Sequence, residues 1–339
     1  MTIQQAIKQA IARQDIPFDE MLDVMREIMS GDATPAQIAG LLVALNMKGE
    51  TIDEVSAAAT VMRELARKVD VTAAPLMDTC GTGGDGSQTF NISTATAFVV
   101  AAAGGFVAKH GNRSVSSSSG SADVLEKLGV KIDLSAEEVA KCIDQIGIGF
   151  MFAPAHHNAT RHAALPRKEL GVRTLFNVLG PLTNPAMAPI QLMGIFNRHW
   201  QKIAIEVLHK LGTHRAFVVT ANDGLDEISI GDTTHIASLI NGEISYFDVR
   251  PEDFGFRTQE LNLIKAKDVD HSAEIISHVL DAEPGPATDI VTINAGAAIY
   301  LCDIAKTMED GVNIARQTIA SGNAKQKLQE LVSFSQSFQ

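Results

Sequence analysis

Apolar positions in the first part of the chain repeat with helical spacing. Ile3, Ile7 and Ile11 recur every four residues, which predicts an amphipathic helix at the start of the sequence. The apolar pattern over residues 19–29 predicts a second helix. No alternating, strand-like pattern interrupts this region, so its elements are expected to be helical throughout.

Capping signals predict where two more helices begin. Thr34 is a favourable N-cap residue, and Pro35 suits the first helical position, where a backbone N–H would have no helical partner. Thr51 is followed three residues later by Glu54, which is the pattern of a capping box. Short helices that follow one another in this way predict a small all-helical domain over residues 1–70.

Beyond Val69, short apolar runs alternate with helical stretches, as in α/β proteins. The runs predicted as strands are 106–109, 148–152, 192–196 and 216–220, and Asn241-Gly242 predicts a hairpin within 236–249. The stretches predicted as helices are 121–128, 137–146, 199–211, 287–302, 310–320 and 324–334. We therefore expect residues 71–339 to form a larger α/β domain with a central, mostly parallel sheet flanked by helices.

Prolines gather in one segment between these predicted strands. Pro166, Pro181, Pro185 and Pro189 fall within 24 residues, numbered 166–189. This segment is predicted to cross between the two domains and to contribute to the helical one.

Composition and charge narrow the classes of protein. The chain has 339 residues, of which 45% are hydrophobic and 20% charged, so one large or two unequal globular domains are expected. The 28 basic and 40 acidic residues give a net charge of −12, which disfavours a generic nucleic-acid binder. No apolar stretch is long enough to span a bilayer, no signal peptide is recognisable, and the three cysteines are widely spaced. These features predict a cytoplasmic protein.

The segment 78–86, with the sequence Asp-Thr-Cys-Gly-Thr-Gly-Gly-Asp-Gly, is the sharpest local motif. It formally satisfies G-x-G-x-x-G, but a dinucleotide fold also needs an acid about 20 residues later. No acid lies between Asp85 and Asp123, and no Lys-Ser/Thr follows as in a phosphate-binding loop. A flexible turn is the plain alternative. We favour a loop whose bare backbone approaches phosphates, beside a helix that opens near Asn91.

A second polar loop follows the strand predicted at 106–109. It runs from Lys109 to Asp123 and contains a lysine, an arginine, an asparagine, two glycines and six serines. A lysine is a point charge suited to phosphate, and hydroxyl and amide groups can hold the remaining oxygens. A solvated polar loop is the alternative. Two such loops at strand ends favour a phosphorylated ligand, because ligands bind at the carboxyl ends of parallel strands.

Two adjacent acids, Asp226 and Glu227, follow the strand predicted at 216–220. Magnesium takes hard oxygen ligands and usually few carboxylates, with phosphates and water completing its shell. The pair therefore suggests magnesium carried by a phosphorylated substrate. A solvated acidic turn is the alternative.

Together these motifs resemble the anthranilate phosphoribosyltransferase family. The resemblance covers nearly the whole chain, and the segments that carry it are 78–86, 91–94, 109–117, 120–123, 167–184 and 222–227. The one departure is Asn158, where the family pattern has proline after His156-His157. That position is expected at a helix start and not at a ligand.

The resemblance implies transfer of the phosphoribosyl group of 5-phosphoribosyl diphosphate (PRPP) to anthranilate, the second step of tryptophan synthesis. It also implies two Mg²⁺ ions per subunit and a homodimer formed through the helical part. It implies PRPP binding by Gly81, Gly84, Asp85, Thr89, Asn91, Ile92, Ser93, Thr94, Lys109, His110, Gly111, Asn112, Arg113, Ser114, Val115, Ser116, Ser117 and Ser121. Anthranilate would meet Gly81, Asn112 and Arg167, and Mg²⁺ would meet Ser93, Asp226 and Glu227.

These residue types suit the chemistry. An aromatic amine is neutral at pH 7, so its attack on the sugar needs no strong base. The departing diphosphate needs charge stabilisation, which Mg²⁺ and backbone N–H groups supply. The serine run has no convincing base beside it, so a serine nucleophile is not expected. The fork of Arg167 suits the anthranilate carboxylate, although an inter-domain salt bridge is an alternative.

Other assignments stay open at this point. His110 is interpreted either as a group that orients substrate or as a packing residue of its loop. His156 and His157 either line the anthranilate pocket or mark a helix start. A pyrimidine nucleoside phosphorylase on the same fold, and a non-catalytic nucleic-acid-binding relative, are the rival functions. Association with anthranilate synthase cannot be read from the sequence.

Overall fold

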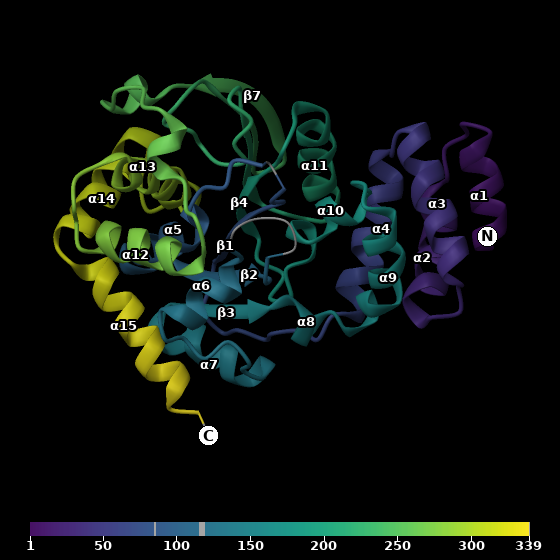
Figure 1. Cartoon of the computed structure of the whole chain (residues 1–339), viewed down its shortest axis with the longest axis horizontal. Coiled ribbons are helices and arrows are strands. Elements are labelled where there is room, and N and C mark those ends of the chain that lie inside the picture. The colour runs from purple at the N-terminus through teal and green to yellow at the C-terminus, as the bar shows by residue number, and fades with distance from the viewer. Residues whose placement is uncertain (85, 115–118, 339) are drawn as a thin grey trace.

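The computed structural model describes residues 1–84, 86–114 and 119–338. A helical bundle stands beside a larger α/β part, and helix α1 lies farthest from the sheet (Figure 1). The bundle is formed by α1 (Ile3–Ile11), α2 (Phe18–Ser30), α3 (Pro35–Lys48) and α4 (Ile52–Leu65). Within the described residues, no helix is long and apolar enough to cross a membrane.

The predicted capping signals are confirmed. Thr34 precedes α3, and its side chain accepts a hydrogen bond from the N–H of Gln37. Thr51 precedes α4 and forms the expected capping box with Glu54. Each cap satisfies a backbone donor that the first turn leaves without a helical partner.

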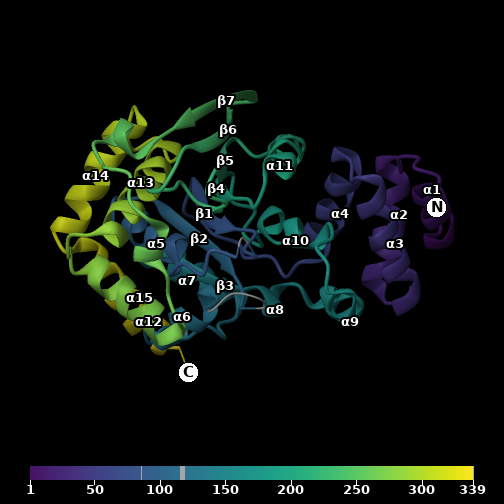
Figure 2. The same ribbon diagram turned by 45° about the horizontal axis from the view of Figure 1, so that its top comes forward.

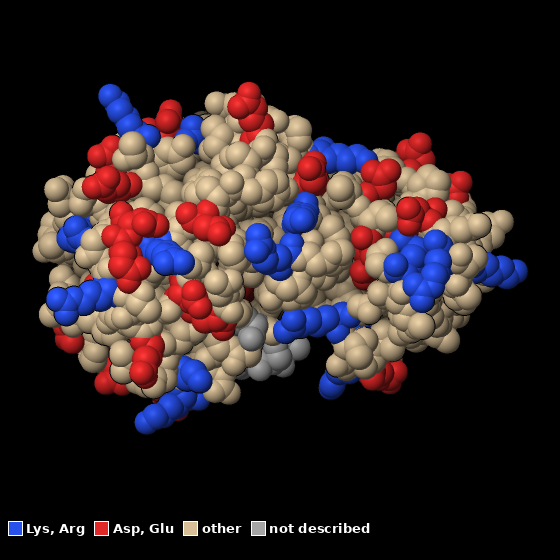
Figure 3. Space-filling model, turned by 90° about the horizontal axis from the view of Figure 1, so that it is seen from above, with Lys and Arg blue, Asp and Glu red and all other residues tan. Residues whose placement is uncertain are grey.

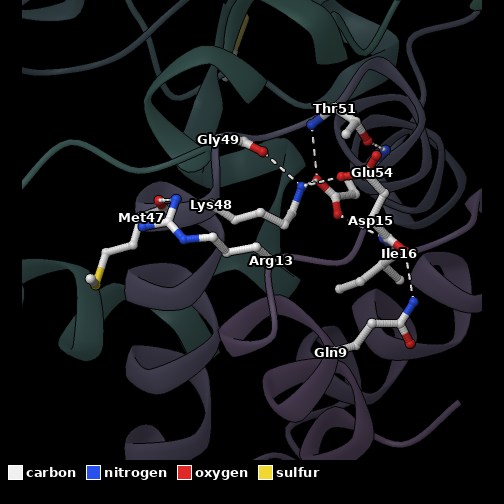
Figure 4. A network of polar contacts seen from close by, with 9 residues as sticks. All are labelled: Gln9, Arg13, Asp15, Ile16, Met47, Lys48, Gly49, Thr51 and Glu54. Carbon is white, nitrogen blue, oxygen red and sulfur yellow. Dashed lines mark hydrogen bonds and ion pairs between the residues drawn. The ribbon is translucent and has the colours of Figure 1, made fainter.

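A buried ion pair fixes the two loops at one end of the bundle (Figure 4). Lys48 Nζ lies 2.8 Å from Asp15 Oδ1 and 3.1 Å from Glu54 Oε2. Glu54 also accepts hydrogen bonds from the backbone N–H groups of Ile16 and Thr51, each at 2.9 Å. A buried charge without partners is costly, so breaking these bonds would destabilise the bundle. They therefore fix the position of the α1–α2 connection against the α3–α4 connection.

The larger part is built on a seven-stranded sheet with the order β3-β2-β1-β4-β5-β6-β7. Strands β1 to β5 are parallel, and β6 and β7 are added antiparallel at one edge. The strands are β1 (Leu76–Gly81), β2 (Phe106–Gly111), β3 (Ile148–Phe152), β4 (Ile190–Gly194), β5 (Arg215–Ala221), β6 (Thr234–Ile240) and β7 (Glu243–Val249). The predicted α/β class and the Asn241-Gly242 hairpin are thus confirmed.

Helices cover both faces of this sheet, as the turned view shows (Figure 2). Alternate side chains along a strand pack into two different hydrophobic cores, one on each face of the sheet. In β5, Phe217 and Val219 face the core beneath α5 and α13, whereas Ala216 and Val218 face the core that α11 shares with the bundle. The helices of this part are α5 (Ile92–Ala102), α6 (Ser121–Lys127), α7 (Ala136–Ile146), α11 (Arg198–Lys210), α12 (Val269–Leu280), α13 (Pro286–Leu301), α14 (Met308–Ala320) and α15 (Asn323–Gln336).

The proline-containing segment is more helical than the sequence suggested. Between β3 and β4 lie α8 (Ala153–His156), α9 (Arg161–Leu170), α10 (Phe176–Leu179) and the 3-10 turns Asn158–Thr160 and Pro181–Thr183. Helix α9 contains Pro166 and packs against α2 and α3. Phe176 and Leu179 of α10 lie in the core that the bundle shares with one face of the sheet.

Three details of the sequence prediction were wrong or incomplete. The run 192–196 is shifted, because β4 begins at Ile190 and ends at Gly194. Strand β1 was not predicted, since it ends in the polar residues that open the glycine motif. Helix α12 was also missed, although Asp268 caps it by accepting from the N–H of His271. Two further 3-10 turns, Pro251–Phe254 and Leu261–Ile264, precede it.

Candidate active site

The carboxyl ends of β1 and β4 lie side by side at the point where the strand order reverses. The chain leaves β1 toward β2 on one side and leaves β4 toward β5 on the other. The two strands end in register on paired glycines, Gly81 and Gly194. Such a switch point opens a crevice at the carboxyl edge of a parallel sheet, which is where ligands bind.

Asp226 lies directly over this glycine pair. A Cβ on Gly194 would stand 1.5 Å from the main-chain oxygen of Asp226, and one on Gly81 would stand 2.6 Å from its Oδ2. The N–H of Gly83 donates to the same Oδ2 at 2.9 Å. Both strands therefore need glycine at their ends, because any side chain there would displace the acidic loop that carries Asp226 and Glu227.

Lys109 reaches the same edge from β2, although it is only 3% exposed. Its Nζ donates to the carbonyl of Thr79 at 2.6 Å and to Ser93 Oγ at 3.3 Å. Burial lowers the pKa of Lys109, while the nearby charges of Asp78 and Glu227 oppose that shift. Lys109 of β2, Ser93 in the first turn of α5 and the acidic loop after β5 are thus brought together at one edge of the sheet.

Asp78 of β1 connects these strands through buried hydrogen bonds. The sequence alone did not assign it a role. Its Oδ1 accepts from the N–H of His110 at 3.1 Å, and its Oδ2 accepts from Asn184 Nδ2 at 2.8 Å. Asn184 also donates to the carbonyl of Ala108 at 2.9 Å. Burial raises the pKa of Asp78, and the charge of Lys109 opposes this. The available signal was the acid that opens the glycine motif.

Asn91 joins the first turn of α5 to two other elements. Its Oδ1 accepts from Ser119 Oγ at 2.8 Å and from Ser272 Oγ of α12 at 2.9 Å. Ser272 was not predicted as part of this region. Within the first turn of α5, Ile92 and Thr94 are buried, and Thr94 Oγ1 has no hydrogen-bond partner within the described structure.

The start of the basic loop is tied to α6. Arg113 Nη1 lies 2.8 Å from both Asp123 Oδ1 and Glu126 Oε2, so its charge is satisfied there. Ser114 donates its N–H to Asp123 Oδ2 at 3.0 Å. The carbonyl of Asn112 accepts from Ser121 Oγ at 3.4 Å.

The remaining residues of the predicted PRPP site have different surroundings. Gly111 lies so close to Ser121 that a Cβ would stand 2.1 Å from its Oγ. Thr89 forms an isolated antiparallel bridge with Lys265. Gly84 accepts a hydrogen bond from Arg173, which was not predicted as a site residue. The positions that lie outside the described residues are Asp85, Val115, Ser116 and Ser117.

Arg167 and a group of histidines lie between the sheet and the bundle. Arg167 is half-buried, with its Cζ 5.1 Å from the ring centre of Phe176. Burial lowers the pKa of Arg167, and no described carboxylate offsets this effect. The rings of His110 and His157 are 5.1 Å apart, and the Nε2 atom of each has no partner in the described structure.

The pKa values of the histidines are shifted in one direction. Burial lowers the pKa of His157 to about 4, and burial also lowers those of His156 and, more strongly, His110. The cations nearest these rings are Lys109, beside His110, and Arg67, beside His156. Of the helix start expected at these residues, α8 already ends at His156, but a 3-10 turn begins at Asn158 with His157 as its N-cap.

Comparisons with known proteins follow this geometry. Residues 4–66 match the helical bundle domain of the glycosyl transferase family, and residues 73–325 match its α/β domain. The fold and site therefore define a glycosyltransferase in which a helical bundle is joined to an α/β domain.

Relatives identify the branch of this class. The chain is 58% identical over 337 residues to the anthranilate phosphoribosyltransferase of Thioalkalivibrio sulfidiphilus, covering 99% of this chain and 100% of the relative. It is 54% identical to that of a Marinomonas species, covering 100% and 98%. The crystal structure of the enzyme from Thermus thermophilus superposes with a TM-score of 0.93 at 41% identity, covering 98% and 99%. A yeast structure in complex with PRPP and Mg shares the fold, with a TM-score of 0.90 at 24% identity and coverage of 99% and 98%.

The chain belongs to the anthranilate phosphoribosyltransferase family. It is an enzyme of tryptophan biosynthesis that transfers a phosphoribosyl group to anthranilate.

Proposed function

We propose that PRPP binds across the carboxyl ends of β1 and β2, with its diphosphate between the glycine loop, the first turn of α5 and Lys109. The observation that carries this proposal is the meeting of Lys109, Ser93 and the Asp226 loop over paired glycines. Bare glycine backbone lets a phosphate approach closely, and the N–H groups of a helix start favour an anion. The buried lysine adds a fixed positive charge in a poorly solvated site.

We assign Mg²⁺ to Ser93, Asp226 and Glu227, with two ions per subunit. Oxygen atoms of these residues fit the metal, and the residues converge on the proposed diphosphate position. No group of three or more His, Cys, Asp or Glu side chains that would hold a metal occurs in the described parts of the chain. This suits an ion that takes most of its remaining ligands from substrate and water. When bound, Mg²⁺ supplies charge stabilisation to the leaving diphosphate.

Anthranilate is proposed to enter between the bundle and the sheet, with its carboxylate on Arg167 and its ring near Gly81 and Asn112. The arginine fork matches a carboxylate, and its partial burial strengthens that attraction. The neutral rings of His110 and His157 would provide a wall that does not repel or protonate the amine. Because the amine is already neutral, these residues need only orient it toward the sugar carbon.

An assay of anthranilate fluorescence tests this function. Purified chain should consume the signal only when anthranilate, PRPP and Mg²⁺ are all present. Loss without PRPP, or no loss from folded protein, would contradict the proposal. Phosphorolysis of thymidine or uridine is the matched assay for the nucleoside phosphorylase alternative and should be absent.

A homodimer through the bundle is also proposed. Ile11 of α1 and Met47 of α3 are 69% and 68% exposed, and Leu165 of the adjacent α9 is exposed as well. Exposed apolar side chains on neighbouring helices favour burial against a second copy. The mass from light scattering should be that of a dimer, and Met47→Lys should shift it toward the monomer.

We place the enzyme in the cytoplasm, which suits its unpaired cysteines.

The charges on the face shown in Figure 3 do not support the alternative of a nucleic-acid-binding protein. Basic and acidic side chains are interspersed there, without a continuous basic stripe. A nucleic-acid site would require such a stripe.

A further inference from the structure

Arg173 lies where three parts of the molecule meet. Its main-chain carbonyl accepts a hydrogen bond from Asn46 Nδ2 of α3 at 2.8 Å. Its guanidinium donates to the main-chain carbonyl of Gly84 in the glycine loop. Its Cζ also lies 4.2 Å from the ring centre of Phe196, which follows β4. One exposed arginine thus joins the bundle to both loops that leave the sheet at the switch point.

The glycine loop needs such a contact to hold one shape. Gly83, Gly84 and Gly86 all have positive φ, at 63°, 72° and 77°. Glycine has the most conformational freedom to lose, so a loop built from it is costly to order. The N–H groups of Thr82 and Gly83 are anchored on Gly194 and Asp226, at 3.0 and 2.9 Å. The Arg173 contact adds an anchor one residue further along the loop.

The geometry uses properties that are specific to arginine. The guanidinium carbon lies over the Phe196 ring while Nη2 of the same planar group donates to the Gly84 carbonyl. A lysine carries the same charge, but its compact ammonium cannot stack flat on the ring and keep that direction. A substitution by lysine therefore keeps the positive charge but removes the geometry of the guanidinium contacts.

We propose that Arg173 is a positioning residue, which holds the glycine loop in its binding conformation and ties that conformation to the position of the helical bundle. The effect on catalysis rests on the proposed placement of PRPP at this loop. The effect on the loop itself does not, because the contacts of Arg173 are made by the protein alone.

Hydrogen exchange of the substrate-free, full-length chain tests the first part. In Arg173→Ala, peptides that cover residues 81–90 should exchange faster than in the wild type, and Arg173→Lys should not restore protection. Arg198→Ala is the matched control, since it removes an exposed arginine near Phe196. Unchanged exchange in Arg173→Ala, or an equal increase in the Arg198 control, would overturn the proposal.

Steady-state kinetics test the second part. The KM for PRPP should rise about tenfold in Arg173→Ala, the size expected for losing one charge-assisted hydrogen bond at an exposed site. The anthranilate KM and kcat should change much less, and Phe196→Leu should give a smaller change in the PRPP KM. Faster loop exchange with an unchanged PRPP KM would overturn the positioning role. A wild-type enzyme without PRPP-dependent turnover would instead refute the proposed function, while the exchange result would still stand.

Discussion

The N–H of Gly83 donates to Oδ2 of Asp226 at 2.9 Å and so joins the glycine loop to the acidic loop. The two residues are far apart in the sequence, and the β1–β4 pairing brings their loops together. The carboxylate is thus positioned by backbone before any substrate arrives. Changes to the acids should therefore act on the glycine loop as well as on the metal that we propose they bind.

Asp226→Asn combined with Glu227→Gln should lower kcat/KM about a hundredfold or more, because the charge proposed to hold Mg²⁺ is removed. The Mg²⁺ concentration that gives the half-maximal rate should rise. Asp133→Asn, which removes one exposed carboxylate elsewhere, is the control. A magnesium titration indistinguishable from that of the wild type would exclude a metal role for the pair.

Arg167→Ala should raise the anthranilate KM about tenfold or more, since the proposed pair between this partly buried arginine and the substrate carboxylate would be lost. The PRPP KM should stay close to the wild-type value. Lys168→Ala removes a neighbouring exposed charge and should leave both constants unchanged. If anthranilate KM and kcat/KM are the same in Arg167→Ala and the wild type, the assignment is wrong.

Asn184→Ala should destabilise the fold by about 2–3 kcal/mol, because Asp78 and the carbonyl of Ala108 lose a buried donor. The free energy of unfolding from denaturant titration measures this loss. Asn313→Ala, at an exposed position of α14, is the control and should cost much less. Equal losses in the two variants would mean that the Asp78–Asn184 bond contributes little.

The free energy of unfolding should decrease as the pH is lowered through the range set by the pKa of His157. Its pKa is about 4 in the folded chain because of burial and the nearby His156, whereas an unfolded histidine titrates near about 6.5. The unfolded state therefore binds more protons, so the contribution of this group is complete above pH about 6.5 and is lost as the pH falls toward about 4. From pH 6.5 to 5 the loss is about 2 kcal/mol for one such group.

His157→Gln should reduce the slope of unfolding free energy against pH in that range. His209→Gln, which changes an exposed histidine, should leave the slope as it is in the wild type. The measurement is a series of denaturant titrations between pH 7 and 4.5. An unchanged slope in His157→Gln would show that this ring does not remain neutral in the folded enzyme.

Local signals carried much of the prediction of the fold. The Thr51 capping box and the Asn241-Gly242 hairpin were read correctly because each depends on a few neighbouring residues. Helix α9 was missed because Pro166 argues against a helix interior, and its burial against α2 and α3 outweighs that local cost. Strand β1 was missed because half of its pattern is polar.

The sequence by itself determined which loops carry phosphate-suited chemistry, since glycine, lysine, serine and acidic residues each bring their chemistry with them. Only the tertiary structure decided how these loops meet. Strand order places Asp226 over Gly81 and Gly194, directs Arg113 to acids on α6, and brings Arg173 to Gly84. Such contacts join residues distant in the chain, so they depend on packing and register, which no local pattern encodes.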